Sequence, residues 1–343
     1  MSLLLLYMGK NDTYYNKYMY FFIIICDIIY INFGKDENML ASRLNKGDTI
    51  GIVSPSSPVT EDLIPQLKQG IQVFKDMGFN VVLSKNIYSN TLRYSATIDE
   101  KVEDIHEMFS NNEVKAIICS QGGQNSNAIL PYLNYDLIKE NPKIIMGISD
   151  STALLNAIYA KTGLVTYHQN DIIWGIGREI YEKEIADLKL RLLEGKTGDI
   201  EHFTQWKCLK EGKAEGVLVG GNLWTFTKLL KTPYCPDLSN CILFLEEFAS
   251  ETPIDEIDSK INLLKQHGVF DKIKGLWLGY YEKDNNVIKF EDVVLNNLSE
   301  YNFPIIKCND FGHNCENVLI PIGSKVNFDA TNCKIEIIEK FLK

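Results

Sequence analysis

The 343-residue sequence lacks several patterns that would define its class at once. Its eight cysteines form no C-x-x-C pair, and there is no G-x-G-x-x-G fingerprint and no long block of Lys and Arg. Scattered cysteines in a chain of this length do not indicate a disulfide framework, so we expect reduced thiols and a cytoplasmic protein. A net charge of −10 without clustered cations disfavours nucleic-acid binding. Cys308, His313 and Cys315 lack a fourth ligand at zinc-finger spacing, so we expect no metal and no cofactor.

Long apolar runs are also scarce, with one exception near the N-terminus. Tyr18–Phe33 is almost continuously apolar, but it is shorter than the roughly 20 residues of a membrane helix and contains Asp27. It has no basic region close in front and no small-residue cleavage site behind, which disfavours a secretory signal. A membrane anchor through residues 18–33 and an additional N-terminal element are alternatives. We favour upstream sequence ahead of a start at Met39, because ordered patterning begins only at Lys46.

The first half of the chain alternates short apolar runs with helical periodicity, which predicts a parallel sheet covered on both faces. We expect strands at Thr49–Val53, Asn80–Leu83, Ala116–Cys119 and Lys143–Ile148, and helices at Ile64–Met77, Ile98–Phe109 and Thr152–Tyr159. Functional residues of such sheets gather in the loops beyond the carboxyl ends of the strands.

The second half contains more strand signals than helix signals. We expect strands at Gly216–Val219, Cys241–Leu245, Gly275–Leu278, Pro304–Lys307, Val326–Phe328 and Ile335–Ile338, and a helix at Ile257–Gln266. The predicted fold class is therefore α/β, with an N-terminal parallel-sheet α/β sandwich and a smaller, α+β, barrel-like C-terminal domain. The predicted boundaries are an extension outside the fold (1–45), the first domain (46–195), a connector (196–212) and the second domain (213–343).

A candidate nucleophile, Ser149, lies between the fourth strand and the helix after it. Such a turn exposes the hydroxyl, and the backbone N–H of Asp150 then faces a developing oxyanion at the helix N-terminus. The G-x-S-x-G pattern is incomplete because Ser151 occupies its last position. The alternative is that Ser149 and Asp150 only cap the helix.

A serine nucleophile needs a histidine base and an acid that orients it. Among five histidines, His168 follows a strand-like run and His313 follows Gly312 in a loop, and the pattern does not decide between them. Glu246 follows a buried apolar run, where a carboxylate is either a paired structural group or a site residue.

Two glycine pairs follow predicted strands. Gly122 and Gly123 allow close backbone approach to a ligand, and their N–H groups are oxyanion candidates. Gly220 and Gly221 form a similar turn before Asn222. A simple tight turn is the alternative at both places.

From about Gly47 to Lys340 the sequence resembles the serine peptidase family of LD-carboxypeptidases and microcin C self-immunity proteins. The resemblance rests on ordered blocks that cover most of the chain: GDTIGIVSPSSP (47–58), GGQNSNAILPYLNYDLI (122–138), NPKIIMGISDSTALLNAIYAKTGLVTYH (141–168), GVLVGGNLW (216–224), ILFLEE (242–247) and DFGHNCENVLIPIG (310–323).

The resemblance implies a triad of Ser149, His313 and Glu246, with the nucleophile from the first domain and its partners from the second. It implies that the oxyanion is held by the backbone N–H groups of Asp150 and of the Gly122-Gly123 turn, and it leaves His168 a structural role. The reaction implied is hydrolysis of an amide bond in a small peptide or peptidyl conjugate, through an acyl-enzyme, in a homodimer.

The sequence departs from the family at two places near the expected site. Gln121 replaces the Arg that usually precedes the Gly pair, and the GGQNSN block is more like the microcin-immunity branch. The loop from His168 to Gly177 is altered, and within it Trp174 either stacks on a flat substrate group or packs under the loop. Asn222 is a second candidate for substrate binding. Murein tetrapeptide and an aminoacyl-nucleotide conjugate are both compatible with the triad; a catalytically silent peptide-binding module and a general esterase are the alternative functions.

Overall fold

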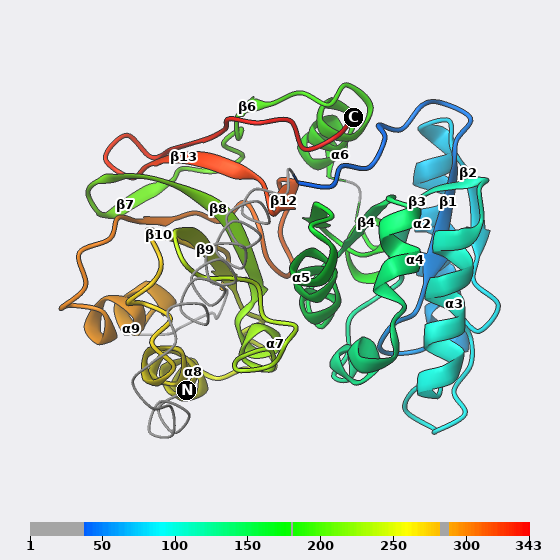
Figure 1. The fold of residues 1–343 in the computed structure, drawn as a ribbon, viewed down its shortest axis with the longest axis horizontal. Helices are drawn as coiled ribbons and strands as arrows, with labels where there is room; N and C mark the ends of the chain where they lie inside the picture. Colours follow the sequence, from blue (N-terminus) through cyan, green and yellow to red (C-terminus); the bar gives the residue numbers. More distant parts are fainter. Residues whose placement is uncertain (1–37, 180, 282–287) are drawn as a thin grey trace, which may run out of the picture. The chain divides into compact units, whose positions relative to one another are not determined.

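Two β-sheets form the core of the computed structural model, which describes residues 38–179, 181–281 and 288–343 (Figure 1). The first sheet has the strand order β12-β5-β4-β3-β1-β2, in which β1 to β5 are parallel and β12 is antiparallel to β5. Its strands are β1 (Thr49–Val53), β2 (Asn80–Leu83), β3 (Val114–Cys119), β4 (Ile144–Gly147), β5 (Thr166–His168) and β12 (Ile320–Ile322).

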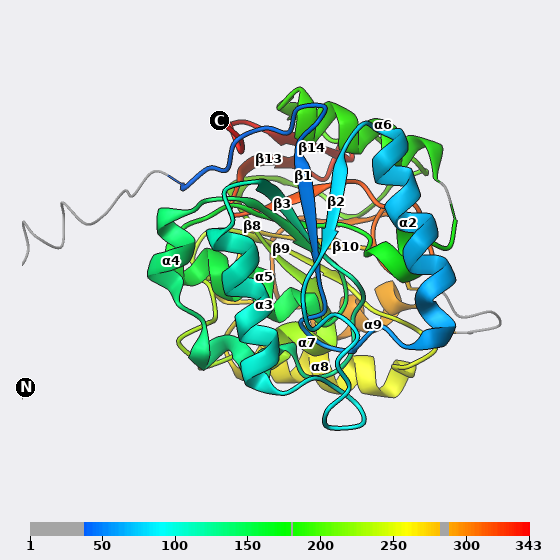
Figure 2. The ribbon, with the colours of Figure 1, turned by 90° about the vertical axis from the view of Figure 1, so that its right-hand side faces the viewer.

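Helices cover both faces of this sheet, as the alternating pattern predicts. They are α2 (Ile64–Asp76), α3 (Ile98–Ser110), α4 (Tyr135–Glu140) and α5 (Ser151–Thr162), with the short helices η1 (Glu61–Leu63), η2 (Ser126–Tyr132) and η3 (Ile172–Ile176). Figure 2 shows α2 on one side of β1 and β2, and α3, α4 and α5 on the other. This arrangement follows from the strand order, because the chain reverses direction across the sheet between β1 and β3. Ligands bind at such a switch point, beyond the carboxyl ends of the strands.

The second sheet has the strand order β6-β14-β13-β8-β9-β10-β11-β7. Its four central strands, β8 to β11, are parallel, and the outer strands are antiparallel to their neighbours. Its strands are β6 (Gly198–Asp199), β7 (Lys207–Lys210), β8 (Lys213–Asn222), β9 (Cys241–Glu246), β10 (Gly275–Leu278), β11 (Ile305–Lys307), β13 (Lys325–Asp329) and β14 (Lys334–Ile337). Its helices are α6 (Glu182–Leu188), η4 (Lys189–Leu193), α7 (Leu223–Thr227), α8 (Ile254–Gln266) and α9 (Phe290–Asn297).

The α/β class and the two-part architecture are confirmed. The second sheet is open, however, rather than closed into a barrel, because its edge strands β6 and β7 do not pair with each other in the described part of the chain. Both edge strands come from the predicted connector, 196–212, which is therefore built into the sheet. A further unexpected strand, β12, comes from near the C-terminus and completes the first sheet (Figure 1).

Residues 38–45 pack against the rest of the fold, although the sequence assigns them to the extension. The Met39 backbone N–H donates to the Gly163 carbonyl (2.9 Å), and the Val165 N–H donates to the Met39 carbonyl (3.0 Å). Ala41 and Leu44 are buried. The remainder of the predicted extension, including Tyr18–Phe33, lies outside the described residues. Within the part of the chain that is described, no helix is both long and apolar enough to cross a membrane.

Candidate active site

Ser149 occupies the sharp turn between β4 and α5. Its φ angle is +61°, in the left-handed region that side chains other than glycine seldom adopt. The turn begins after the buried strand β4 ends at Gly147, and the helix starts at Ser151. A strained strand-to-helix turn of this kind is typical of an exposed nucleophilic serine and persists only where the surrounding structure holds it.

Gly122 leaves the space that the Ser149 side chain needs. A Cβ atom added to Gly122 would lie 2.7 Å from both Cβ and Oγ of Ser149, and 3.5 Å from the Asp150 nitrogen. The loop after β3 therefore lies directly against the turn that carries Ser149. The same loop is held to the loop after β1, since the Ser57 N–H donates to the Gly122 carbonyl (3.2 Å).

The second sheet contributes a paired carboxylate and imidazole. Glu246 is the last residue of β9 and is fully buried, and its Oε2 lies 2.7 Å from Nδ1 of His313. Burial favours the neutral imidazole, but the charge of Glu246 and its hydrogen bond outweigh it and raise the pKa of His313 above its usual range. Likewise, burial opposes ionisation of Glu246, but His313 holds the pKa of Glu246 below its ordinary value.

The loop that carries His313 has a conformation that requires glycine. Gly312 has a φ of +130°, and a Cβ there would lie 3.1 Å from Tyr280 and 3.3 Å from the Cβ of Glu246. The Asn317 side chain closes the loop: its Oδ1 accepts from the Gly312 N–H (2.7 Å) and its Nδ2 donates to the Gly312 carbonyl (2.9 Å). The Phe248 ring stacks on the imidazole of His313, with the two ring centroids 4.8 Å apart.

The predicted connector holds this loop in place. The Asp310 carboxylate accepts hydrogen bonds from the Phe203 N–H (2.7 Å) and from Nε1 of Trp206 (2.6 Å). Asp310 is itself fully buried. The connector thus provides the donors that a buried carboxylate requires, and it positions the segment immediately before His313.

A buried face of α6 supports the same loop. Oε2 of Glu184 accepts from the Asn317 N–H (2.9 Å) and from Nδ2 of Asn170 (2.8 Å). Burial raises the pKa of Glu184 to about 8, although these two hydrogen bonds oppose the rise. Asp187, one turn further along, accepts from the Leu319 N–H (2.8 Å) and pairs with Arg191. Sequence reasoning missed these residues, although Glu184, Asp187 and Arg191 have the spacing of one helix face.

Ser149 and His313 line one cavity of about 630 Å³, a volume suited to a small ligand. Trp174, half-exposed on η3, forms part of its wall, and its Nε1 donates to Oε1 of Gln121 (2.9 Å). Arg178 is the only Lys or Arg among the described residues that line the cavity, and its guanidinium lies 3.3 Å from Oδ1 of Asn314.

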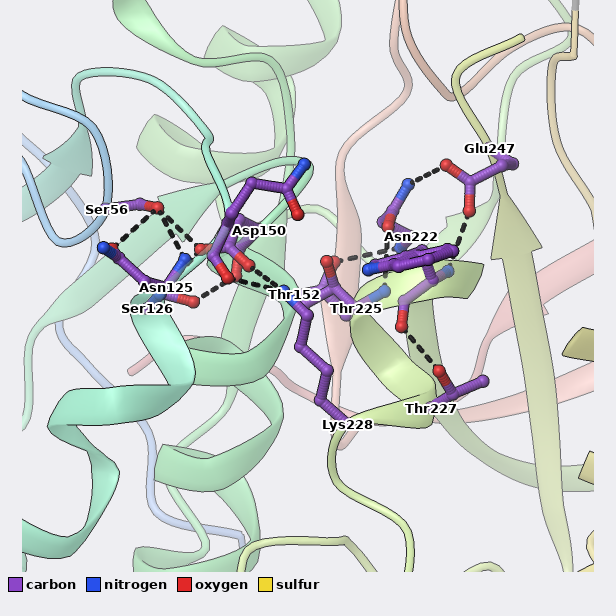
Figure 3. Close-up of polar contacts among 12 residues, drawn as sticks. Ser56, Asn125, Ser126, Asp150, Thr152, Asn222, Thr225, Thr227, Lys228 and Glu247 are labelled. Carbon is purple, nitrogen blue, oxygen red and sulfur yellow. Dashed lines mark hydrogen bonds and ion pairs between the residues drawn. The ribbon is translucent and has the colours of Figure 1, made fainter. Parts of the chain in front are cut away.

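Asn222 lies at a neighbouring position, in a smaller cavity of about 230 Å³ that Ser149 also lines. Its side chain is buried and already engaged: Oδ1 accepts from the Thr225 N–H (3.0 Å) at the start of α7, and Nδ2 donates to Oε1 of Glu247 (2.8 Å). Figure 3 shows this network beside the residues around Asp150. The two substrate-binding candidates, Trp174 and Asn222, therefore lie in adjacent cavities.

His168, the second histidine candidate, is fully buried on β5. Its ring packs edge-on against Phe244 and Phe311, with centroids 5.4 and 6.0 Å away, and neither ring nitrogen has a hydrogen-bond partner among the described residues. Burial lowers the pKa of His168 to about 4, so the imidazole is neutral at pH 7. It does not line the cavity that contains Ser149. No group of three or more metal-ligating side chains occurs among the described residues.

Two family models match the chain. The LD-carboxypeptidase N-terminal domain matches residues 50–169, and the LD-carboxypeptidase C-terminal domain matches residues 215–328. The microcin C7 self-immunity protein MccF of Escherichia coli is 32% identical over 89% of this chain and 97% of its own. A probable murein peptide carboxypeptidase of Bacillus subtilis is 32% identical over 88% of this chain and 95% of its own.

Solved structures show the same similarity. The structure of MccF in complex with glutamyl sulfamoyl guanosine has a TM-score of 0.82 at 29% identity, and it covers 89% of this chain and 99% of that one. An MccF-like protein from Bacillus anthracis has a TM-score of 0.78 at 32% identity, over 87% and 99%. The chain belongs to the LD-carboxypeptidase family and is a serine-type carboxypeptidase, a hydrolase of peptide bonds.

Proposed function

We propose that Ser149 is the nucleophile of this carboxypeptidase, His313 its general base, and Glu246 the acid that orients the base. The observation that carries the proposal is the meeting of a strained serine turn from one sheet and a carboxylate–imidazole pair from the other at one cavity. Because Nδ1 of His313 contacts Glu246, Nε2 is the nitrogen left to take the serine proton.

The proposed reaction proceeds through an acyl-enzyme. Ser149 Oγ attacks the amide carbonyl as its proton moves to His313, and the imidazolium that forms is stabilised by Glu246. The backbone N–H groups of Asp150 and of the Gly122-Gly123 turn hold the tetrahedral oxyanion, at about 3–4 kcal/mol for each donor. His313 then protonates the leaving amine, and water releases the acyl group by the reverse sequence.

We further propose that the leaving group carries an anion that Arg178 binds. A murein peptide offers a terminal carboxylate, and an aminoacyl-nucleotide conjugate offers a phosphate-like group. Guanidinium binds both through paired hydrogen bonds. Among the described residues that line the cavity, Arg178 is the one with a permanent positive charge. Gln121, at the position where the family usually has Arg, is neutral. Trp174, on the same wall, offers a flat surface for the remainder of the leaving group.

Fluorophosphonate labelling tests the nucleophile. We expect Ser149 to be labelled, and Ser149→Ala to lose labelling and turnover while it keeps the wild-type melting temperature. Ser57→Ala, which removes another hydroxyl from the cavity wall, is the matched control and should keep both labelling and turnover. Failure of the wild-type protein to react at Ser149 would support the silent binding module instead, and turnover of short acyl esters but not of amides would support the general esterase.

Two substrates, each with a neutralised counterpart, test the leaving-group anion. The wild-type enzyme should cleave the free-acid tetrapeptide or the aminoacyl-nucleotide conjugate at least about tenfold better, in kcat/KM, than the amidated or uncharged analogue. Arg178→Met should remove this preference by raising KM. Equal turnover of charged and neutralised substrates would contradict the assignment of Arg178.

The oligomeric state and the location are also part of the proposal. The homodimer rests on the family resemblance, and the cytoplasmic location rests on the cysteine pattern. Sedimentation of the purified chain at micromolar concentration tests the dimer, and cell fractionation tests the location.

A further inference from the structure

Lys228 is a cation close to the nucleophile turn that the proposed mechanism does not use. It follows the last residue of α7 and therefore belongs to the second sheet's half of the chain. Its ammonium group nevertheless reaches the first half, where Nζ lies 2.8 Å from Oδ1 of Asp150 (Figure 3). The same Nζ lies 2.9 Å from the Gln124 carbonyl. The Lys228 side chain is only 19% exposed and the Asp150 side chain is fully buried, whereas the contact with the Gln124 carbonyl lies at the surface.

Asp150 is held from both sides. Its second oxygen, Oδ2, accepts from Ser56 Oγ (2.6 Å) and from the Ser126 N–H (2.6 Å), while Oδ1 accepts from Lys228. Burial alone would raise the pKa of Asp150, but the charge and hydrogen bond of Lys228 lead the interactions that hold it below its usual range. The carboxylate is thus ionised and engaged by donors from three separate segments, among which only Lys228 carries a charge.

The two acceptors of Lys228 belong to the two segments that carry the proposed oxyanion donors. Asp150 follows the nucleophile and offers its own backbone N–H, and Gln124 follows the Gly122-Gly123 turn. Oxyanion donors contribute to catalysis only when their directions are fixed before the reaction. Ser126, two residues after Gln124, already bonds to Asp150 through its N–H and its hydroxyl. The ammonium group of Lys228 adds a charged link between the same two segments, on the other carboxylate oxygen of Asp150.

We propose that Lys228 is a positioning residue, which holds the Asp150 turn and the Gln124 loop at the separation at which their N–H groups bind the oxyanion. The inference rests on the proposed function. The proposed oxyanion donors all belong to the first half of the chain. The inference is that a side chain of the second half aligns them. A second hydrogen bond joins the two halves close to Lys228: the Asn222 N–H donates to Oγ1 of Thr152 (2.9 Å) at the start of α5.

The test compares Lys228→Met and Lys228→Arg with Lys85→Met, which removes an exposed ion pair with Glu103. The readouts are kcat, KM, melting temperature and the inhibition constant of a substrate-like peptide boronic acid, whose adduct with the serine is tetrahedral. We expect Lys228→Met to lower kcat by about 10- to 100-fold and to weaken boronate binding by a similar factor, with KM within about twofold. Lys228→Arg should keep most of both, and Lys85→Met should change neither.

The outcome that overturns the inference is a Lys228→Met protein whose melting temperature falls while kcat and boronate affinity stay within about twofold of wild type. If Lys228→Met does not fold, Lys228→Gln, which can still donate to one acceptor, provides the same comparison. Fluorophosphonate labelling of the wild-type enzyme separates the two proposals. Absence of labelling at Ser149 overturns the proposed function and this inference with it, whereas normal labelling with unchanged Lys228 variants overturns this inference alone.

Discussion

The two sides of the site are held in place by different means. On the nucleophile side, Ser149 sits in a tight turn whose strand, turn and helix are consecutive in the chain. On the base side, the His313 loop depends on groups from far along the sequence, including the Glu184 carboxylate, the Phe203 backbone N–H and the Trp206 indole N–H. The proposed nucleophile therefore lies in a strained local turn, whereas the proposed base lies on a loop held by hydrogen bonds from distant residues.

This difference has a consequence for how each side responds to substitution. A strained turn has few alternative conformations, so a change there acts on the reacting atoms directly. A loop held by several distant hydrogen bonds can lose one of them and still close, at a cost in both stability and precision. We therefore expect activity and stability to be affected separately on the nucleophile side and together on the base side.

The largest effect is expected at the contact where the base meets its acid. Glu246→Gln should lower kcat/KM by about 10³–10⁴-fold, because the imidazolium loses its counter-charge. Since Glu246 raises the pKa of His313, its removal should also move the acid limb of the pH–rate profile to lower pH. Glu247, one residue further on, raises the same pKa by its charge but ranks below Glu246 as a cause, so Glu247→Gln should shift the acid limb less and cost far less in kcat/KM. An unchanged acid limb in Glu246→Gln would show that this pair does not govern the rate.

A methyl group beside the nucleophile should have the next largest effect. Gly122→Ala places a carbon 2.7 Å from Ser149 Oγ, so the hydroxyl or the loop must move. We expect kcat to fall about 100-fold while the melting temperature changes little. Gly47→Ala, where the added carbon meets open space but the backbone has a φ of +92°, is the control, and it should lower the melting temperature without lowering kcat. A wild-type kcat in Gly122→Ala would show that the turn that carries Ser149 tolerates displacement of its hydroxyl.

On the base side, Asp310→Asn should affect both properties at once. The substitution removes the charge that attracts the Phe203 and Trp206 donors, and we expect a loss of about 1–3 kcal/mol in the free energy of unfolding. Kcat should fall about tenfold as the loop loosens. Denaturant midpoints and steady-state kinetics measure the two effects, with Asp199→Asn as an exposed control. A loss of stability without any loss of kcat would show that the contacts between the connector and Asp310 do not affect catalysis.

The smallest effect on activity is expected for Glu184→Gln. With a pKa of about 8, Glu184 is mostly protonated at pH 7, and glutamine is a close substitute for the protonated acid. Because the folded state holds this proton more tightly than the unfolded state, stability should fall as pH rises from about 4.5 to about 8, by up to about 1.4 kcal/mol per pH unit. The glutamine variant should lack this contribution. An identical pH dependence of stability in both proteins would contradict the buried, protonated acid.

The sequence predicts those parts of the fold that local patterns encode. The strands Thr49–Val53, Asn80–Leu83 and Gly275–Leu278 have the predicted limits, because each is a short apolar run next to turn residues. The strand β12 was not predicted, because Pro321 lies within a three-residue run and such runs usually indicate loops. The role of the connector was also missed, because β6 and β7 are largely exposed and become strands only through pairing with distant partners.

The site shows the same division. The turn at Ser149 and the close approach at Gly122 follow from a strand, a glycine pair and a helix start, which are local signals. The choice of His313 over His168 came from the family resemblance, because both histidines follow strand-like segments and only the tertiary structure shows which one reaches the cavity. Lys228 gave no signal, since a lone lysine after a short helix is normally solvated, and its contacts with Asp150 and Gln124 exist only when the two halves meet.

The strand β12 has a consequence for the order in which the protein is made. Residues 320–322 form the edge of a sheet whose other strands end by His168, so that sheet lacks its edge strand until residue 322 has been synthesised. A nascent chain that has completed β5 exposes an unpaired strand edge while residues 169–319 are synthesised, and such edges promote pairing with other chains. Truncation just before Ile320 should therefore leave β5 with an unpaired edge and a polypeptide that needs chaperones.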